Sequence, residues 1–121
     1  MWERRNKKAV NNGRKAEKIV EQMTKQKVNR KSTLDFPDGI IVRGWVIGEI
    51  KSVEKLRRNS EKRFSRITIE AQQEKELKEK CLNLLLIIHH ENIKAIIPYD
   101  VLDGHRQYSV RKLLEKAIEI W

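Results

Sequence analysis

Hydrophobic and polar residues follow helical spacing in two parts of the chain. After Asn12-Gly13, apolar residues recur at the i, i+3, i+4 and i+7 positions of a helix with one buried face, namely Ala16, Ile19, Val20 and Met23. This spacing predicts a first helix that ends near Gln26. The end of the chain has a similar amphipathic pattern and predicts a helix that runs to the last residue, with apolar positions Val110, Leu113, Leu114, Ala117, Ile118 and Trp121.

Runs of β-branched and aromatic residues predict strands between these two helices. Ile40–Val42 and residues 45–47 flank Arg43-Gly44, which indicates a hairpin with a tight turn. Residues 82–88 and Ile93–Ile97 are almost continuously apolar, as is typical of strands covered on both faces. A further short strand is predicted at residues 28–30.

The remaining segments complete an α/β pattern. The stretch from Lys51 to Arg66 is the most highly charged part of the chain and is expected to be a solvated loop, whereas residues 70–79 are good helix formers and predict a second helix. The predicted order is α-β-β-β-α-β-β-α. Strands and helices in this order indicate a mixed β-sheet flanked by helices.

Length and charge limit the domain organisation and the class of partner. A chain of 121 residues is expected to form a single domain over residues 1–121, with residues 1–8 as a disordered basic arm. The chain has 27 Lys and Arg residues against 17 Asp and Glu residues, a net charge of +10. Such an excess suits a polyanionic partner such as nucleic acid or an anionic membrane surface.

Several features argue against other locations and other chemistry. The N-terminus has no apolar signal region and no segment is apolar enough to span a membrane, so an intracellular, cytoplasmic protein without a membrane partner is expected. The single cysteine, Cys81, is expected to be a buried and inert thiol. Adjacent His89 and His90 would face opposite sides of a strand, which disfavours a zinc site. No Gly-rich phosphate loop is present, so no nucleotide cofactor is expected.

The candidate chemistry lies on the predicted hairpin. Pro37-Asp38 opens one strand, and Glu49-Ile50-Lys51 closes the next, so the hairpin brings both carboxylates to one edge of the sheet. Side chains alternate along a strand, so Glu49 and Lys51 point together while Ile50 points into the opposite layer. Asp35 is an alternative to Asp38, but it lies in the preceding link.

This arrangement contains what metal-dependent phosphodiester cleavage requires. Mg²⁺ prefers oxygen ligands and takes one or two protein carboxylates, so Asp38 and Glu49 can form a site, with the backbone carbonyl of Ile50 as a further ligand. Lys51 would orient or deprotonate the attacking water, or hold the phosphate as a point charge. The sequence leaves both roles open.

A family resemblance adds to this interpretation. Gly13-Arg-Lys-Ala-Glu-Lys-Ile-Val20, the Pro37-Asp38 strand, Gly48-Glu-Ile-Lys51, Ile67-Thr-Ile-Glu-Ala-Gln-Gln73 and Ile93-Lys-Ala-Ile-Ile-Pro-Tyr99 resemble segments of the archaeal-type Holliday junction resolvases. These enzymes belong to the PD-(D/E)xK, or restriction-endonuclease-like, nuclease superfamily. The likeness extends over about residues 13–101. It departs from the family in a slightly shorter hairpin, a longer basic loop and almost no tail.

The resemblance implies a function and a set of site residues. It implies an endonuclease that resolves four-way DNA junctions in recombination and repair as a homodimer, with Mg²⁺ or Mn²⁺, in an archaeal cell or one infected by an archaeal virus. Glu17 would join the metal site, and Gln73, with Gln72 as a near equal, would join the catalytic set. The expected DNA-binding residues, from the resemblance and from the basic loop, are Lys18, Arg30, Lys31, Ser32, Lys55, Arg57, Arg58, Lys62 and Arg63.

Other functions remain open at this stage. A nuclease of the same superfamily that cuts flaps, bubbles or duplex sites would carry the same site residues. A non-catalytic DNA-binding protein, with structural carboxylates, is the more distant alternative. Metal-dependent nicking of any DNA would eliminate it.

Overall fold

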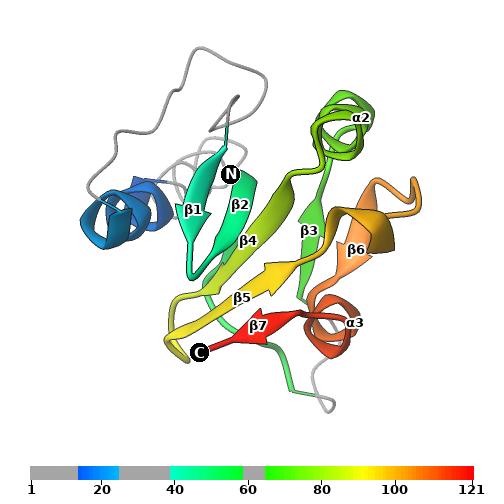
Figure 1. The fold of residues 1–121 in the computed structure, drawn as a ribbon. Helices are drawn as coiled ribbons and strands as arrows, with labels where there is room; N and C mark the ends of the chain where they lie inside the picture. The colour runs from blue at the N-terminus through cyan, green and yellow to red at the C-terminus, as the bar shows by residue number, and fades with distance from the viewer. Residues whose placement is uncertain (1–13, 25–38, 59–64) are drawn as a thin grey trace.

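A five-stranded mixed sheet lies at the centre of the fold in the computed structural model, which describes residues 14–24, 39–58 and 65–121 (Figure 1). Its strand order is β1-β2-β4-β5-β7, and a second, two-stranded sheet pairs β3 with β6. The strands are β1 (Ile40–Val42), β2 (Trp45–Val53), β3 (Arg66–Thr68), β4 (Asn83–Ile88), β5 (Ile93–Ile97), β6 (Gln107–Ser109) and β7 (Glu119–Ile120). The helices are an N-terminal helix at residues 14–24, α2 (Ala71–Lys80), the short 3₁₀ helix η1 (Tyr99–Val101) and α3 (Val110–Glu115). The chain is therefore mixed α/β, as its pattern predicts.

The connections between strands follow from local chemistry. β1 and β2 form the predicted antiparallel hairpin, and its turn residues Arg43 and Gly44 both have positive φ, 51° and 85°. Two such residues in succession give a turn whose twist matches the twist of the strands. β2 and β4 are parallel, and the connection between them contains β3 and α2, because parallel neighbours require a long crossover. β4 then returns antiparallel as β5 through the turn at residues 89–92.

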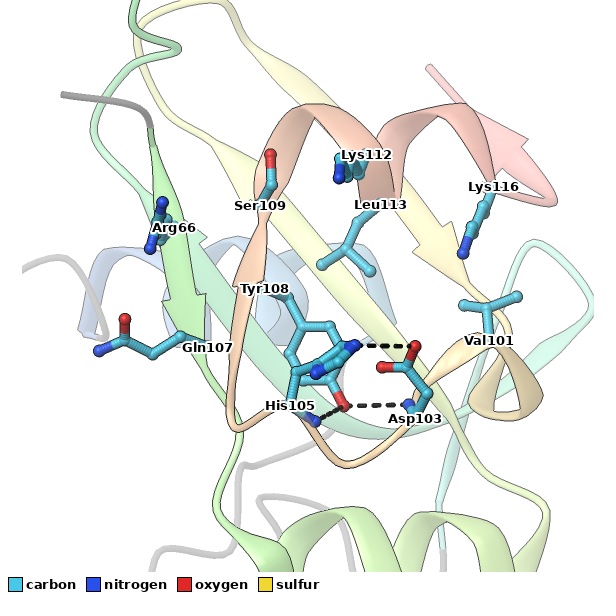
Figure 2. Close-up of a pocket in the computed structure, with 10 residues that line it drawn as sticks. All are labelled: Arg66, Val101, Asp103, His105, Gln107, Tyr108, Ser109, Lys112, Leu113 and Lys116. Atoms are coloured by element: carbon cyan, nitrogen blue, oxygen red, sulfur yellow. Dashed lines mark hydrogen bonds and ion pairs between the residues drawn. The ribbon is translucent and has the colours of Figure 1, made fainter. Parts of the chain in front are cut away.

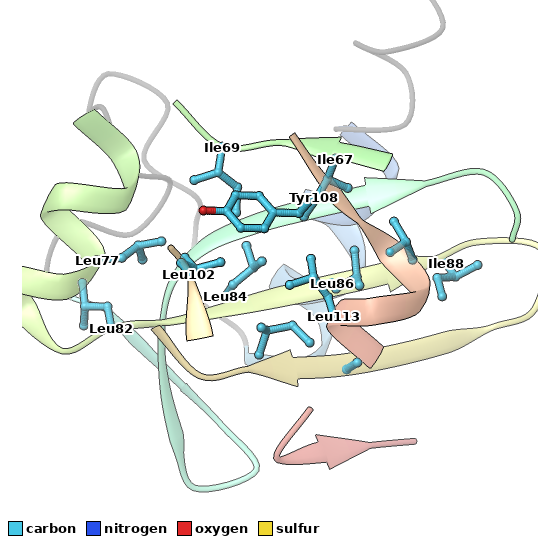
Figure 3. Packing of buried hydrophobic residues seen from close by; sticks show 13 residues of the cluster. Ile67, Ile69, Leu77, Leu82, Leu84, Leu86, Ile88, Leu102, Tyr108 and Leu113 are labelled. Atoms are coloured by element: carbon cyan, nitrogen blue, oxygen red, sulfur yellow. The ribbon is translucent and has the colours of Figure 1, made fainter. Parts of the chain in front are cut away.

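Two hydrophobic clusters cover the two faces of the sheet. Every residue of β4 is buried: Leu84, Leu86 and Ile88 belong to one cluster, and Leu85 and Ile87 to the other. The first cluster also takes residues from β3, β6, α2 and α3 (Figure 3). The second takes Ala16 and Val20 of the N-terminal helix. β4 is thus covered on both faces, as its unbroken apolar run predicts.

The predicted C-terminal helix is wrong in its second half. α3 ends at Glu115, and the chain then forms β7 beside β5. The backbone N–H of Lys94 donates to the Trp121 carbonyl at 2.8 Å, and the Trp121 N–H donates to the Lys94 carbonyl at 2.9 Å. A continued helix would leave the backbone N–H and C=O groups at the edge of β5 without β7 as a partner. Hydrogen bonding between β7 and β5 therefore overrides the helical spacing of the sequence.

Other boundaries also differ from the sequence-based order. β2 continues through Val53, so the charged segment begins later than expected, and the short strands β3 and β6 were not predicted. The predicted strand at residues 28–30 lies outside the described residues. Cys81 is exposed rather than buried, because it caps α2 in a left-handed conformation with φ 55°. No helix among the described residues is long and apolar enough to cross a membrane.

Candidate functional site

A bulge in β2 sets the direction of the candidate site residues. Ile47 pairs with Asn83, but Glu49 pairs with Leu84, so Gly48 is an extra residue in the ladder. The shift lets both Ile47 and Ile50 enter the second hydrophobic cluster although they are three residues apart. Glu49 and Lys51 consequently lie on the other side of the strand. The predicted alternation around Ile50 is confirmed.

Close packing explains why a glycine occupies the bulge. A Cβ atom at position 48 would lie 2.6 Å from Leu82 Cβ and 3.0 Å from Leu77 Cδ2. These leucines come from the C-terminal end of α2 and the residue that precedes β4. Gly48 thus allows α2 to pack directly against β2 beside the candidate site.

A pocket of about 440 Å³ brings together residues from segments far apart in the sequence. The N-terminal helix contributes Ala16 and Glu17, β2 contributes residues 49–52, β3 contributes residues 66–68, and α2 contributes Gln73. The sequence-predicted residues that line it are Glu17, Glu49, Ile50, Lys51 and Gln73. The N-terminal helix, β2, β3 and α2 therefore all contribute residues to one pocket.

Two carboxylates stand in this pocket in partly desolvated positions. Glu49 is only 3% exposed, and Glu17 is half-buried beside Ala16 and Val20, which anchor its helix. The Oε2 atom of each carboxylate is inaccessible to solvent. Attraction between a carboxylate and a cation is stronger at such positions than in bulk water. Lys51 supplies one positive charge to the same pocket.

The donor set fits a hard divalent cation. Carboxylate oxygens are preferred ligands of Mg²⁺, which takes one or two of them and keeps several waters. Glu17 and Glu49 give this pocket two carboxylates. No group of three or more Asp, Glu, His or Cys side chains suited to a metal occurs within residues 14–24, 39–58 and 65–121. A metal here would complete its shell with water, backbone oxygen or substrate.

Gln73 and Gln72 have different positions, which separates the two candidates. Gln73 lines the pocket, and its Oε1 accepts a hydrogen bond from the Glu70 N–H at 3.0 Å. Gln72 instead donates from Nε2 to Glu76 Oε1 at 2.9 Å along the helix surface. Gln73 is therefore the residue of this pair that a substrate in the pocket would meet.

The predicted DNA-binding residues are only partly described. Lys18, Lys55, Arg57 and Arg58 are exposed. Arg30, Lys31, Ser32, Lys62 and Arg63 lie outside the described residues, and so does Asp38, the predicted metal ligand. The basic segment after β2 is held at Arg57, whose N–H donates to Ser65 Oγ at 3.0 Å and whose carbonyl accepts from the Arg111 guanidinium. Its described part is thus anchored, although its cationic side chains face solvent.

Sequence reasoning did not place β3 at the pocket. Ser52, Arg66, Ile67 and Thr68 line it. The exposed-buried-exposed alternation of Arg66–Thr68 is the signal of a strand. Three residues are too few for this signal to stand out from the charged segment before it.

Comparisons with protein-family models, curated proteins and solved structures found no match to this chain. The proposals below therefore depend on the site itself and on the resemblance carried by its motifs.

Proposed function

We propose that this protein is a Mg²⁺-dependent DNA endonuclease of the restriction-endonuclease-like type, and that it resolves four-way junctions. One observation carries the proposal. Glu17, Glu49, Lys51 and Gln73, chosen from sequence motifs, line a single pocket although they come from three separate elements. Chance placement of charged residues gives no reason for such convergence.

The carboxylates would hold the metal. Glu17 and Glu49 line the pocket, and the motif adds Asp38 and the backbone carbonyl of Ile50. Mg²⁺, or Mn²⁺ in its place, would supply Lewis-acid stabilisation of charge on the phosphate and its leaving oxygen. The burial of Glu49 places its charge in surroundings of low dielectric constant, where attraction to a cation is stronger than in water.

Lys51 and Gln73 would act on the substrate and the water. In hydrolysis a water oxygen bonds to phosphorus, the bond from phosphorus to the leaving oxygen breaks, and that oxygen takes up a proton. Lys51 would hold a phosphate oxygen as a point charge or orient the attacking water. Gln73 is fixed by its bond from Glu70 and would contact the nucleic acid or the water.

The fold and the charge agree with this proposal. The β1–β2 hairpin, the crossover through α2 and the parallel strand β4 give a mixed sheet with helices, which supports a nuclease of this type. The net charge of +10 suits DNA. A nuclease that acts on other DNA structures would have the same features. They therefore support a nuclease of this type more strongly than they support a preference for four-way junctions.

Resolution of a four-way junction needs two symmetric cuts, which a homodimer with two-fold symmetry supplies. β5 and the end of the chain are apolar, but they are largely part of the core of the described structure. Ala95, Ile96 and Ile97 of β5 are fully buried, and Trp121 packs on the second hydrophobic cluster. The exposed large apolar residues of the described chain are Met23, Ile41, Trp45, Val46, Ile118 and Ile120.

The substrate class is tested with labelled DNA. A synthetic four-way junction and a linear duplex of the same sequence are incubated with the protein, with and without Mg²⁺. We expect paired cuts in the junction only with Mg²⁺, and little cutting of the duplex. Equal cutting of junction and duplex would mean that the protein is a nuclease without a preference for junctions. Binding of DNA without any cutting would contradict the proposed nuclease activity.

A further inference from the structure

A second cavity, of about 340 Å³, lies between β6, α3 and residues 101–105 (Figure 2). Arg66 and Gln107 stand on its strand side, and Lys112 and Lys116 project from the α3 side. Nothing in the proposed cleavage chemistry uses this cavity. Its lining is nevertheless strongly basic.

The positive charge of the cavity is not balanced by nearby acids. Among the described residues, Arg66, Lys112 and Lys116 form no ion pair. The acidic residue of the lining, Asp103, instead lies 3.2 Å from His105 Nε2. Lys112 lies in α3 and Lys116 caps its C-terminal end, so both bring positive charge to the same side of the cavity. A bound anion would offset this charge.

The floor of the cavity is fixed by a hydrogen-bond network. The Tyr108 hydroxyl accepts the backbone N–H groups of Asp103, Gly104 and His105 at 2.9–3.2 Å, and it donates to Glu74. Tyr108 is 6% exposed and belongs to the first hydrophobic cluster. Hydrogen bonds through Tyr108 thus fix the loop at residues 103–105 to α2 and to the core, and the basic side chains lie around this loop.

Arg66 connects this cavity to the candidate active site. It lines both cavities, and it pairs across the ladder with Ser109, which lines the second cavity. Ile67 and Tyr108 point into the core, so the outer face of the β3–β6 pair is polar. A strand of nucleic acid that enters the active-site pocket past β3 would continue over this face.

We propose that the cavity bounded by Arg66, Lys112 and Lys116 binds a backbone phosphate of the DNA strand whose neighbouring phosphate lies in the pocket of Glu17 and Glu49. This inference depends on the proposed function. It identifies where the cut strand is held, on residues in α3 and directly after it that the sequence motifs do not include. The contact reads no base, because a cationic cavity recognises the phosphate charge.

The test compares two doubly substituted proteins with equal charge. Lys112→Gln/Lys116→Gln removes two charges from the cavity and keeps most of each side-chain stem. Lys75→Gln/Lys80→Gln removes two exposed charges from α2 that line neither cavity. Binding of a fluorescent four-way junction is measured in EDTA over a range of salt concentrations. The parent's cleavage of the same junction is measured with Mg²⁺.

We expect the α3 variant to bind about tenfold more weakly than the parent, with a salt slope less steep by about 0.9 for each lost phosphate contact. The α2 variant should show a much smaller change. A series of junctions with one neutral methylphosphonate at a time should contain a position that weakens the parent but not the α3 variant. That position would identify the bound phosphate as part of the DNA.

Each remaining outcome overturns a defined claim. If the parent binds and cuts while both variants lose affinity equally, the cavity is not a phosphate site, and the proposed function stands. If the parent binds but never cuts, the proposed function fails, and a selective loss in the α3 variant still establishes the cavity. A parent that does not bind DNA would overturn both.

Discussion

Glu17 and Glu49 bring two carboxylates to one pocket from elements that are distant in sequence. Ala16 and Val20, buried on the same helix, hold Glu17 at the sheet, and the bulge at Gly48 directs Glu49. Carboxylate oxygens are preferred ligands of Mg²⁺. Under the proposed function, these two residues would hold the metal ion.

Glu17→Gln should therefore lower Mg²⁺-dependent cleavage by about 100-fold or more, because loss of a metal ligand costs at least as much as loss of a group that orients one. Gln has almost the same shape as Glu, so the free energy of unfolding without metal should change by less than about 1 kcal/mol. Urea unfolding and junction cleavage of the same preparation provide the two measurements. A larger loss of stability would mean that Glu17 serves the fold.

Tyr108 is the residue on which the loop at residues 103–105 depends. Burial raises the pKa of its hydroxyl, and the hydrogen bond to Glu74 raises it further. The neutral phenol is thus favoured in the folded state. Above pH of about 10 the unfolded chain ionises first, so stability present below that pH is lost as pH rises through the higher folded pKa.

Tyr108→Phe should destabilise the protein by about 1–3 kcal/mol at neutral pH, because several backbone N–H groups and Glu74 lose their shared partner. The parent should also lose more stability than the variant between pH 9 and pH 11, a range of about two units around the ordinary tyrosine pKa. Urea unfolding across this range is the measurement. Equal stability of the two proteins at pH 7 would show that the network contributes nothing.

The β1–β2 hairpin, β4, β5 and α2 follow from the sequence because each has a long or distinctive local pattern. Ile93–Ile97 is confirmed to the residue, and α2 begins one residue after its predicted start. β3, β6 and β7 have three, three and two residues. Such short elements depend on pairing with their partners, and a local pattern of two or three residues is too weak to predict them.

The candidate site could be predicted to the extent that motifs select its residues. Glu17, Glu49, Lys51 and Gln73 do line one pocket, whereas the contribution of Arg66 and Thr68 depends on the pairing of β3 with β6. The bulge at Gly48 also escapes prediction, because it results from packing against Leu77 and Leu82. The sequence alone predicts that Glu49 and Lys51 face away from Ile50. It does not predict which face of the sheet each of them occupies, because the bulge decides that.

Gly48→Ala tests the bulge. The added Cβ would stand 2.6 Å from Leu82 Cβ, so strand and helix must separate, and we expect a loss of about 1–3 kcal/mol. Cleavage should fall as well, because Glu49 is the next residue in β2 and would move with the backbone of residue 48. Gly44→Ala is the comparison: its Cβ meets nothing within 4 Å, and its cost comes from φ +85° alone. If only Gly44→Ala is destabilising, Gly48 is not tightly packed.

Under the proposed function, the charge of the molecule as a whole would guide its binding to DNA. The net charge is +10, and exposed cations follow β2 at Lys55, Arg57 and Arg58. The backbone of Arg57 is held by Ser65 and Arg111, so these cations project from a fixed support. Contacts to phosphates release counterions and make affinity fall steeply with salt.

Arg57→Ala/Arg58→Ala should weaken junction binding for every sequence tested and flatten the plot of log K against log salt by about 0.9 for each lost contact. Folding should change little, because the side chains are exposed. Fluorescence anisotropy at several salt concentrations measures both quantities. A changed sequence preference with an unchanged slope would instead indicate contacts to bases.

The most direct test of the central claim is cleavage of a labelled four-way junction by the parent and by Glu49→Gln, with and without Mg²⁺. Glu49 is 3% exposed and lines the pocket with Glu17 and Lys51. We predict that the parent cuts only with Mg²⁺, and that the variant binds the junction as tightly but does not cut it. Full Mg²⁺-dependent cutting by Glu49→Gln would contradict the proposed site.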